Sequence, residues 1–204
     1  RYYIVNPGLT ATTSPFTSSG HAGSMIHRRR LPSPWSELWT LEDGRTVQLR
    51  PINPRDAEPL RGAFSLLTPE ERRLRFLHPI TEMTPAMAKR LTHLDRRREW
   101  ALVVAEPEPP GDALIGAVVR AAIDESGRRA EFAILVTRFL AHQGIGTLLM
   151  RELLRWVRLK RLEAVYGDVL LENSTMLALC DALGFRRRPA GDPGLVRVEW
   201  RRDG

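Results

Sequence analysis

The segment from residue 130 to residue 161 constrains the fold of this chain more than any other. It begins with a continuous apolar run, Phe132 to Val136, which is typical of a strand covered on both faces. A short loop with two glycines follows, and apolar residues then recur at helical spacing. That apolar stripe consists of Ile145, Leu148, Leu149, Leu153, Trp156 and Val157. The segment therefore predicts a buried strand, a glycine turn and a long amphipathic helix.

Gly144 and Gly146 lie at the junction between the predicted strand and helix. The first turn of a helix has N–H groups without partners and a positive dipole end, and residues without Cβ let an anion approach them. The spacing of these glycines matches neither of the common nucleotide-binding motifs. From the residues alone, an anion-binding turn and an ordinary glycine turn both remain open.

Three motifs follow one another around this junction: Gln143-Gly144-Ile145-Gly146, a predicted strand at 164–170, and a helix opened by Asn173 that ends in Leu183-Gly184-Phe185. Together they resemble the GNAT superfamily of N-acetyltransferases, whose acetyl-CoA motif is Q/R-x-x-G-x-G/A between a strand and a helix. The resemblance covers about residues 39–188. The first polar position of the motif is Ala141 here, whereas the second is kept as Gln143.

Several further segments match in order: Leu41–Arg45, Leu49–Ile52, Asp56-Ala57, Leu67–Glu70, Arg75-Phe76, Leu91-Thr92 and Ala130–Ala133. They are similar to the catalytic domain of bacterial Pat-type protein lysine acetyltransferases. This resemblance implies an enzyme that moves an acetyl group from acetyl-CoA to a primary amine, most often a lysine side chain of another protein. A small-molecule amine as acceptor and a non-catalytic acyl-CoA-binding regulatory module are the alternatives.

Hydrophobic periodicity and turn residues predict a strand, three helices, three strands, a helix, a strand, a helix and a last strand, which indicates a mixed α/β sheet. The strands around Ile134 and Val169 are expected to be parallel, with the long helix as a right-handed crossover. The resemblance implies the GNAT fold: a mostly antiparallel twisted sheet, a central parallel pair splayed around acetyl-CoA, and helices on both faces. Residues 195–200 are expected to form a final edge strand.

Residues 1–36 differ in kind from the rest of the chain. The stretch 10–24 is rich in Thr, Ser, Gly, Ala and Pro and has no apolar period, and the first methionine is Met25. We therefore predict a flexible leader over 1–36 and one GNAT domain over 37–204, and a cloning remnant and a misplaced start are both open explanations for residues 1–24. Removing the leader is expected to leave the melting temperature unchanged.

The composition, with 43% hydrophobic and 27% charged residues, is that of a soluble globular protein. The net charge of +7 comes almost entirely from arginines spread among acidic residues, so we expect no dedicated nucleic-acid surface, and no apolar run is long enough for a membrane span. The single cysteine, Cys180, fits a reducing compartment, and we expect a cytoplasmic protein.

The resemblance assigns residues to acetyl-CoA. The pantetheine arm is expected to pair with the backbone of Ile134, Leu135 and Val136. The pyrophosphate is expected on the loop and first helical turn, which comprise His142, Gln143, Gly144, Ile145, Gly146 and Thr147. His142 is included by position, since a lone loop histidine is more often inert. Asn173 is both a good helix N-cap and the family's contact to the arm, and these two roles are equally open.

Acetyl transfer needs a neutral amine, and a free lysine with a pKa near 10.4 is almost fully protonated at pH 7. A positioned carboxylate can accept the proton. Glu131 is the candidate, because the resemblance places the general base of Pat-type enzymes there. The alternatives are a simple ion pair between Glu131 and Arg129, and Asp168 as a second carboxylate.

The position where many GNAT enzymes carry a tyrosine that protonates the leaving thiolate is Cys180 here. Met176, Cys180 and Leu183 share an apolar helix face, so a buried, structural cysteine is expected. The general acid stays unassigned, and direct attack of the amine is favoured over an acetyl-cysteine intermediate. His78 and His93 are too far apart in the sequence to suggest a metal site, and none is predicted.

Overall fold

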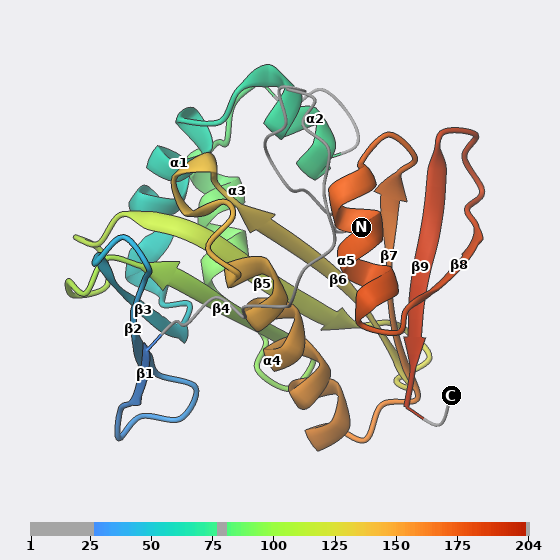
Figure 1. Ribbon diagram of the computed structural model, residues 1–204, viewed down its shortest axis with the longest axis horizontal. Coiled ribbons are helices and arrows are strands. Elements are labelled where there is room, and N and C mark those ends of the chain that lie inside the picture. Colours follow the sequence, from blue (N-terminus) through green and yellow to red (C-terminus); the bar gives the residue numbers. More distant parts are fainter. Residues whose placement is uncertain (1–26, 77–80, 203–204) are drawn as a thin grey trace, which may run out of the picture.

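The computed structural model describes residues 27–76 and 81–202, shown in Figure 1. The strands are β1 (His27–Arg30), β2 (Glu37–Thr40), β3 (Thr46–Pro51), β4 (Glu99–Ala105), β5 (Ile115–Ile123), β6 (Arg129–Val136), β7 (Ala164–Leu170), β8 (Arg186–Pro189) and β9 (Leu195–Arg201). The helices are α1 (Ala57–Ser65), α2 (Pro69–Phe76), α3 (Pro85–Thr92), α4 (Ile145–Leu159) and α5 (Ser174–Ala182), with short 3-10 helices at Pro54–Asp56 and Arg138–Leu140.

All nine described strands belong to one sheet in the order β1-β2-β3-β4-β5-β6-β7-β9-β8. Every neighbouring pair is antiparallel except β6 and β7, which are parallel and joined through α4. This pair is registered over only three positions, of which Glu131 opposite Tyr166 is the last. Beyond that point the two strands diverge, as Figure 1 shows. The predicted mixed sheet with a splayed parallel pair is therefore confirmed.

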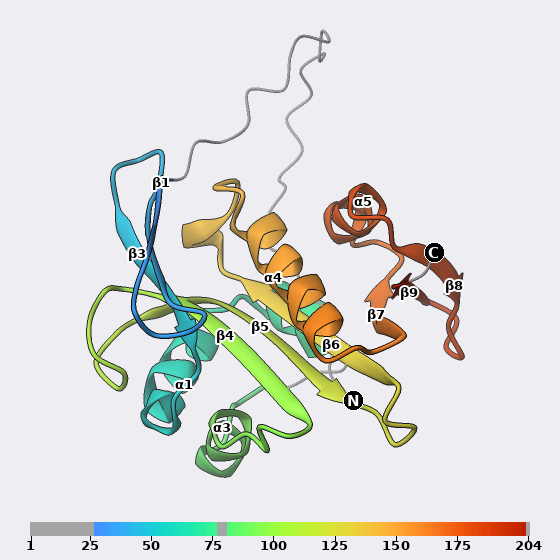
Figure 2. The same cartoon turned by 90° about the horizontal axis from the view of Figure 1, so that it is seen from below.

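Helices cover both faces of the sheet, with α4 and α5 on one side and α1 and α3 on the other (Figure 2). The predicted apolar stripe of α4 is buried: Leu149, Leu153 and Val157 are fully buried, and Trp156 stacks on Trp100 of β4 with ring centroids 5.5 Å apart. Alternate residues of β4, β5 and β6 enter two separate cores. In β6, Phe132 and Ile134 pack on the α4 side, whereas Leu135 packs on the side of α1 and α3.

The predicted boundary of the leader at residue 36 is corrected by the structure. Strand β1 pairs antiparallel with β2, so residues 27–30 belong to the sheet and residues 31–36 connect its first two strands. Arg28 donates from Nε to Glu37 at 2.7 Å and from Nη2 to Glu152 of α4 at 3.2 Å. Trp35 packs edge-on against Trp100, with ring centroids 5.6 Å apart. Three arginines in a short exposed strand carry no apolar alternation, which is why the pattern was missed; residues 1–26 lie outside the described part of the chain.

Truncation at Ser36 is therefore expected to destabilise the domain, contrary to the sequence-based expectation. Burial of a large apolar side chain contributes about 2 kcal/mol, and loss of Trp35 from this contact lowers the melting temperature by roughly 4–8 °C for a domain of this size. Thermal melts of chains beginning at His27 and at Glu37 measure the effect, with Trp35→Ala in the longer chain isolating the tryptophan. Equal melting temperatures for all three chains would contradict the packing role.

The predicted final edge strand is also corrected. Residues 195–201 form β9, which lies inside the sheet between β7 and β8. The edge is β8, whose exposed sequence Arg186-Arg187-Arg188-Pro189 has no alternation to detect. A charged strand that ends in proline is a suitable edge, because it discourages pairing with other chains.

Candidate functional site

The divergence of β6 and β7 leaves one side of β6 without a neighbouring strand. On its other side, β6 is paired with β5 from Ala130 to Val136. Ile134, Leu135 and Val136 lie in the part of β6 where β7 has moved away. A strand flank of this kind presents backbone N–H and C=O groups that a bound extended group can satisfy. The three residues expected to hold the pantetheine arm are thus located along the opening.

The loop at the wide end of this opening leads into α4. Gly144 is the N-cap residue of α4 and has a left-handed backbone, with φ 72° and ψ 0°, and no side chain caps the helix. Hydrogen bonding within this turn begins with the amide of Leu148, which donates to the carbonyl of Gly144 at 3.1 Å. Among the described residues, none accepts a hydrogen bond from the amides of 143–147. These amides and the helix dipole form a cradle suited to an anion.

Two polar side chains at this opening have buried atoms without hydrogen-bond partners among the described residues: Gln143 at Oε1 and Asn173 at Nδ2. The Asn173 Oδ1 atom accepts from the amide of Met176 at 3.2 Å, so this residue does cap α5. A buried unpaired donor is unfavourable, and it indicates a group that a ligand can satisfy. Gly146 lies near both sides of the opening, since a Cβ there would be 3.5 Å from Leu179 and 3.9 Å from Val136.

Glu131 lies at the narrow end of the opening, at the last paired position of the parallel strands. It is half-buried and faces the same side of the sheet as Leu135, which is the side covered by α1 and α3. The strand register places it in one row across the sheet, and the members of this row are Glu99, Ala122, Glu131, Tyr166 and Glu199. Val136 is five positions further along the extended strand than Glu131, a distance of about 17 Å. The cradle and the carboxylate are therefore at opposite ends of an elongated site.

Tyr166 is the direct neighbour of Glu131 on β7, and the sequence did not single it out. Its ring lies between the guanidinium groups of Arg129 and Arg197, whose central carbons are 5.0 and 4.8 Å from the ring centroid. Burial, followed by the charges of Glu131 and Asp124, raises the pKa of Tyr166. Its hydroxyl therefore stays protonated at neutral pH. Only the register between β6 and β7 brings the two residues together, and no local sequence pattern encodes it.

The alternative roles of the nearby carboxylates are constrained by their partners. Arg129 forms ion pairs with Asp124 at 3.3 Å and with Glu199 at 3.9 Å. Asp168 is buried and accepts two hydrogen bonds from Arg197, both at 2.8 Å. These bonds, as the largest cause, raise the pKa of Arg197. Asp168 thus serves as half of a bidentate ion pair, which leaves Glu131 as the stronger candidate base.

Cys180 is fully buried in α5, within the same core as Phe132 and Ile134. Burial, and to a smaller degree the charge of Asp181, raises the pKa of Cys180 to about 12. A thiol that stays protonated and enclosed is a poor nucleophile. The structural role expected from the sequence is in agreement with these surroundings.

Within residues 27–76 and 81–202, no three His, Cys, Asp or Glu side chains are grouped so that they could hold a metal ion. None of the described helices combines the length and apolar character that crossing a bilayer requires.

Comparison with known proteins agrees with this geometry. Residues 46–186 match the family model described as the acetyltransferase (GNAT) domain. The acetyltransferase PA5475 of Pseudomonas aeruginosa is 32% identical over 151 residues, which cover 74% of this chain and 80% of that protein. The GNAT domain of S. lividans PAT superposes with a TM-score of 0.72 at 25% identity, covering 84% of this chain and 99% of that one. The ribosomal L7/L12 alpha-N-protein acetyltransferase RimL, solved with coenzyme A, shares the fold with a TM-score of 0.59 at 12% identity, over 76% and 93% of the two chains.

The splayed parallel pair, with the glycine turn into α4 at its wide end, agrees with an acyltransferase that uses acetyl-CoA. The chain belongs to the GNAT acetyltransferase family, as the match over 46–186 shows. The predicted fold, enzyme class and co-substrate are thereby confirmed. The assignment of individual residues to acetyl-CoA and to proton transfer stays a prediction, and so does a cytoplasmic location.

Proposed function

We propose that this enzyme acetylates lysine side chains of other proteins and that Glu131 accepts the proton of the attacking amine. The observation that carries the proposal is the position of Glu131, at the vertex of the opening and on the same face of the sheet as Leu135, which faces away from α4, so that an amine can approach from the face opposite to α4. The resemblance to Pat-type enzymes and the likeness to the S. lividans PAT domain favour a protein lysine as acceptor.

Every predicted residue except His142 has a defined task in this proposal. The amides of Gln143 to Thr147 hold the pyrophosphate at the positive end of α4. The backbone of Ile134, Leu135 and Val136 pairs with the pantetheine arm, and the Asn173 Nδ2 atom donates to the same arm. Bound acetyl-CoA supplies the acetyl group as a thioester. The orphaned Asn173 Nδ2 donor supports this fit, because it is buried without another partner among the described residues.

The chemistry then requires the loss of two protons from the nitrogen and one exchange of bonds. The Glu131 carboxylate removes the first proton from the lysine ammonium, directly or through a water molecule. The neutral nitrogen attacks the thioester carbonyl, a C–N bond forms, and the C–S bond breaks as the thiolate of coenzyme A leaves. The nitrogen then gives up its second proton, which passes to the thiolate or to solvent, and the neutral amide remains. The buried, protonated Cys180 supports direct attack, since it is unsuited to form an acetyl-enzyme.

The contact of Asn173 with acetyl-CoA can be separated from its capping role. Asn173→Ser keeps a good N-cap but loses the amide donor, whereas Asn173→Ala loses both. We expect the serine variant to keep its melting temperature and to bind acetyl-CoA roughly 2- to 10-fold more weakly, as for one lost hydrogen bond. Calorimetric titration measures this effect. Wild-type affinity in Asn173→Ser would limit Asn173 to capping α5.

The acceptor class is tested by release of free thiol from acetyl-CoA. Peptides with a blocked N-terminus and one lysine are compared with small amines at equal concentration. We expect lysine peptides to stimulate release, with the acetyl group found on the lysine. Stimulation by small amines alone would favour the alternative function, a small-molecule N-acetyltransferase.

A further inference from the structure

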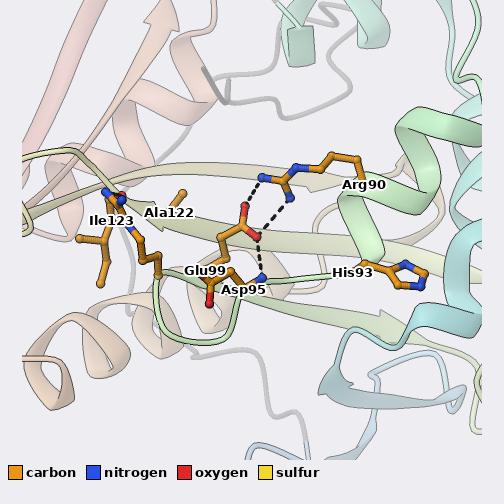
Figure 3. A pocket seen from close by; sticks show the side chains of 7 residues that line it. Arg90, His93, Asp95, Glu99, Ala122 and Ile123 are labelled. Atoms are coloured by element: carbon orange, nitrogen blue, oxygen red, sulfur yellow. Dashed lines mark hydrogen bonds and ion pairs between the residues drawn. The ribbon is translucent and has the colours of Figure 1, made fainter.

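A hollow of about 390 Å³ opens on the face of the sheet that carries Glu131 (Figure 3). Its floor is Ala122 of β5, and its walls include Glu99 of β4 and Arg98 of the loop that follows α3. Ala122 is registered with Glu99 on one side and with Glu131 on the other. Strands are spaced by about 4.8 Å, so the backbones of Glu99 and Glu131 are about 10 Å apart, with Ala122 between them. The hollow is therefore adjacent to Glu131 and large enough for an extended side chain.

The charges on the two sides of the hollow differ. Glu99 is buried and is held by Arg90 through two bonds of 2.6 and 3.1 Å and by the amide of Asp95 at 2.9 Å, as Figure 3 shows. Arg98 instead donates from Nη2 to the backbone carbonyls of Ile123 and Asp124, at 3.2 and 2.7 Å. Carbonyls hold a guanidinium in place without cancelling its charge. Arg98 thus presents a fixed positive charge at the rim of the hollow.

The loop beside the hollow extends this positive surface. Arg96, Arg97 and Arg98 are consecutive and exposed, and Asp95 is the only acidic residue within 95–98. Among the described residues, no carboxylate lies within ion-pair distance of these three guanidinium groups. Asp95 uses Oδ1 to accept from the amide of Arg97. We call residues 95–98 the arginine loop.

We propose that the hollow over Ala122 receives the acceptor lysine and that the arginine loop selects lysines with acidic residues beside them in the sequence. This inference rests on the proposed function and goes beyond it by naming the charge pattern of the substrate. A lysine that enters the hollow passes between the carboxylates of Glu99 and Glu131, while flanking acidic side chains meet Arg96, Arg97 and Arg98 at the rim. Each exposed pair of opposite charges contributes roughly 1.5- to 5-fold, so three arginines give a preference of about tenfold.

The test compares three peptides that share one central lysine and differ only in flanking residues, which are Glu, Gln or Arg. We expect kcat/KM to be about tenfold higher for the Glu peptide than for the Gln peptide, lowest for the Arg peptide, and to converge as salt is added. Arg98→Glu and Arg96→Glu are expected to abolish or reverse the preference with the KM for acetyl-CoA unchanged. Arg96 is exposed, and its side chain forms no hydrogen bond or ion pair with a described residue, so its substitution tests the charge without loosening the loop. Arg151→Glu is the charge-matched control, because Arg151 is exposed on α4 across the sheet.

The outcomes separate this inference from the proposed function. Acetylation of all three peptides at equal rates, or an acidic preference that persists in Arg96→Glu and Arg98→Glu, would overturn the inference and leave lysine acetylation standing. If no peptide is acetylated, the proposed function fails. The arginine loop is then tested with a pair of small amines, one of which carries a carboxylate near the amine, and equal rates for that pair overturn the inference as well.

Discussion

Replacing Glu131 by Gln is expected to reduce turnover by about 10²–10⁴-fold while the affinity for acetyl-CoA is kept. Glutamine preserves the shape and hydrogen-bonding capacity of the side chain but cannot accept a proton. Val136, where β6 ends on the side of the cradle, is about 17 Å from Glu131 along the strand, so we expect binding of the pyrophosphate not to depend on this carboxylate. Steady-state kinetics and calorimetric titration of the two proteins measure both effects.

The pH dependence of this defect distinguishes catalysis from structure. As pH rises from 7 to 10, a growing fraction of the acceptor lysine is deprotonated without help, since its pKa is near 10.4. The rate deficit of Glu131→Gln is therefore expected to shrink at high pH. A purely structural role predicts lower stability and no such recovery. Asp168→Asn is the comparison variant, and wild-type turnover in Glu131→Gln together with a loss in Asp168→Asn would transfer the role of base to Asp168.

Gly144→Glu is expected to abolish measurable binding of acetyl-CoA without unfolding the domain. The substitution places a carboxylate in the cradle, and two like charges about 4 Å apart near a protein surface repel by about 4 kcal/mol, or on the order of 10³ in Kd. The left-handed backbone of Gly144, with φ 72°, adds strain of about 1–2 kcal/mol for any side chain. The repulsion acts only against the bound pyrophosphate. The backbone strain acts on folding, and it is small compared with the stability of a typical domain, so we expect the fold to be kept.

Gly44→Glu is the matched control for this strain. Gly44 has φ 83° in the turn between β2 and β3, and a Cβ there would meet nothing within 4 Å. We expect the two variants to lose similar stability in thermal melts, with only Gly144→Glu losing acetyl-CoA in calorimetry. Unchanged affinity in Gly144→Glu would remove the cradle from residues 143–147.

The elements that the sequence predicted correctly are those whose signals are local. The apolar run from Phe132 to Val136, the glycine turn and the stripe of α4 each follow from nearby residues, and the structure contains all three. Strands β1 and β8 were missed because their arginine-rich sequences have no period-2 pattern. Their pairing partners, rather than their own residues, determine that they are strands.

The surroundings of the candidate site could be predicted only in part. The motif around Gly144 located the cradle, and the resemblance pointed to Glu131. The row that joins Glu99, Ala122, Glu131 and Tyr166 depends on the register of four strands that are distant in the sequence. No single-sequence pattern encodes such a register, so Tyr166 and the hollow over Ala122 were recognisable only in the folded chain.

The central claim, that Glu131 promotes transfer from acetyl-CoA to protein lysines, is tested most directly by mass spectrometry of a protein mixture incubated with the enzyme and acetyl-CoA. The mixture is treated in parallel with the wild-type enzyme, Glu131→Gln and Gly144→Glu at pH 7. We predict new acetyl-lysines with the wild-type enzyme, at least about 100-fold fewer with Glu131→Gln, and none above background with Gly144→Glu. Equal acetylation by the wild-type enzyme and Glu131→Gln, or consumption of acetyl-CoA without any acetylated lysine, would contradict the claim.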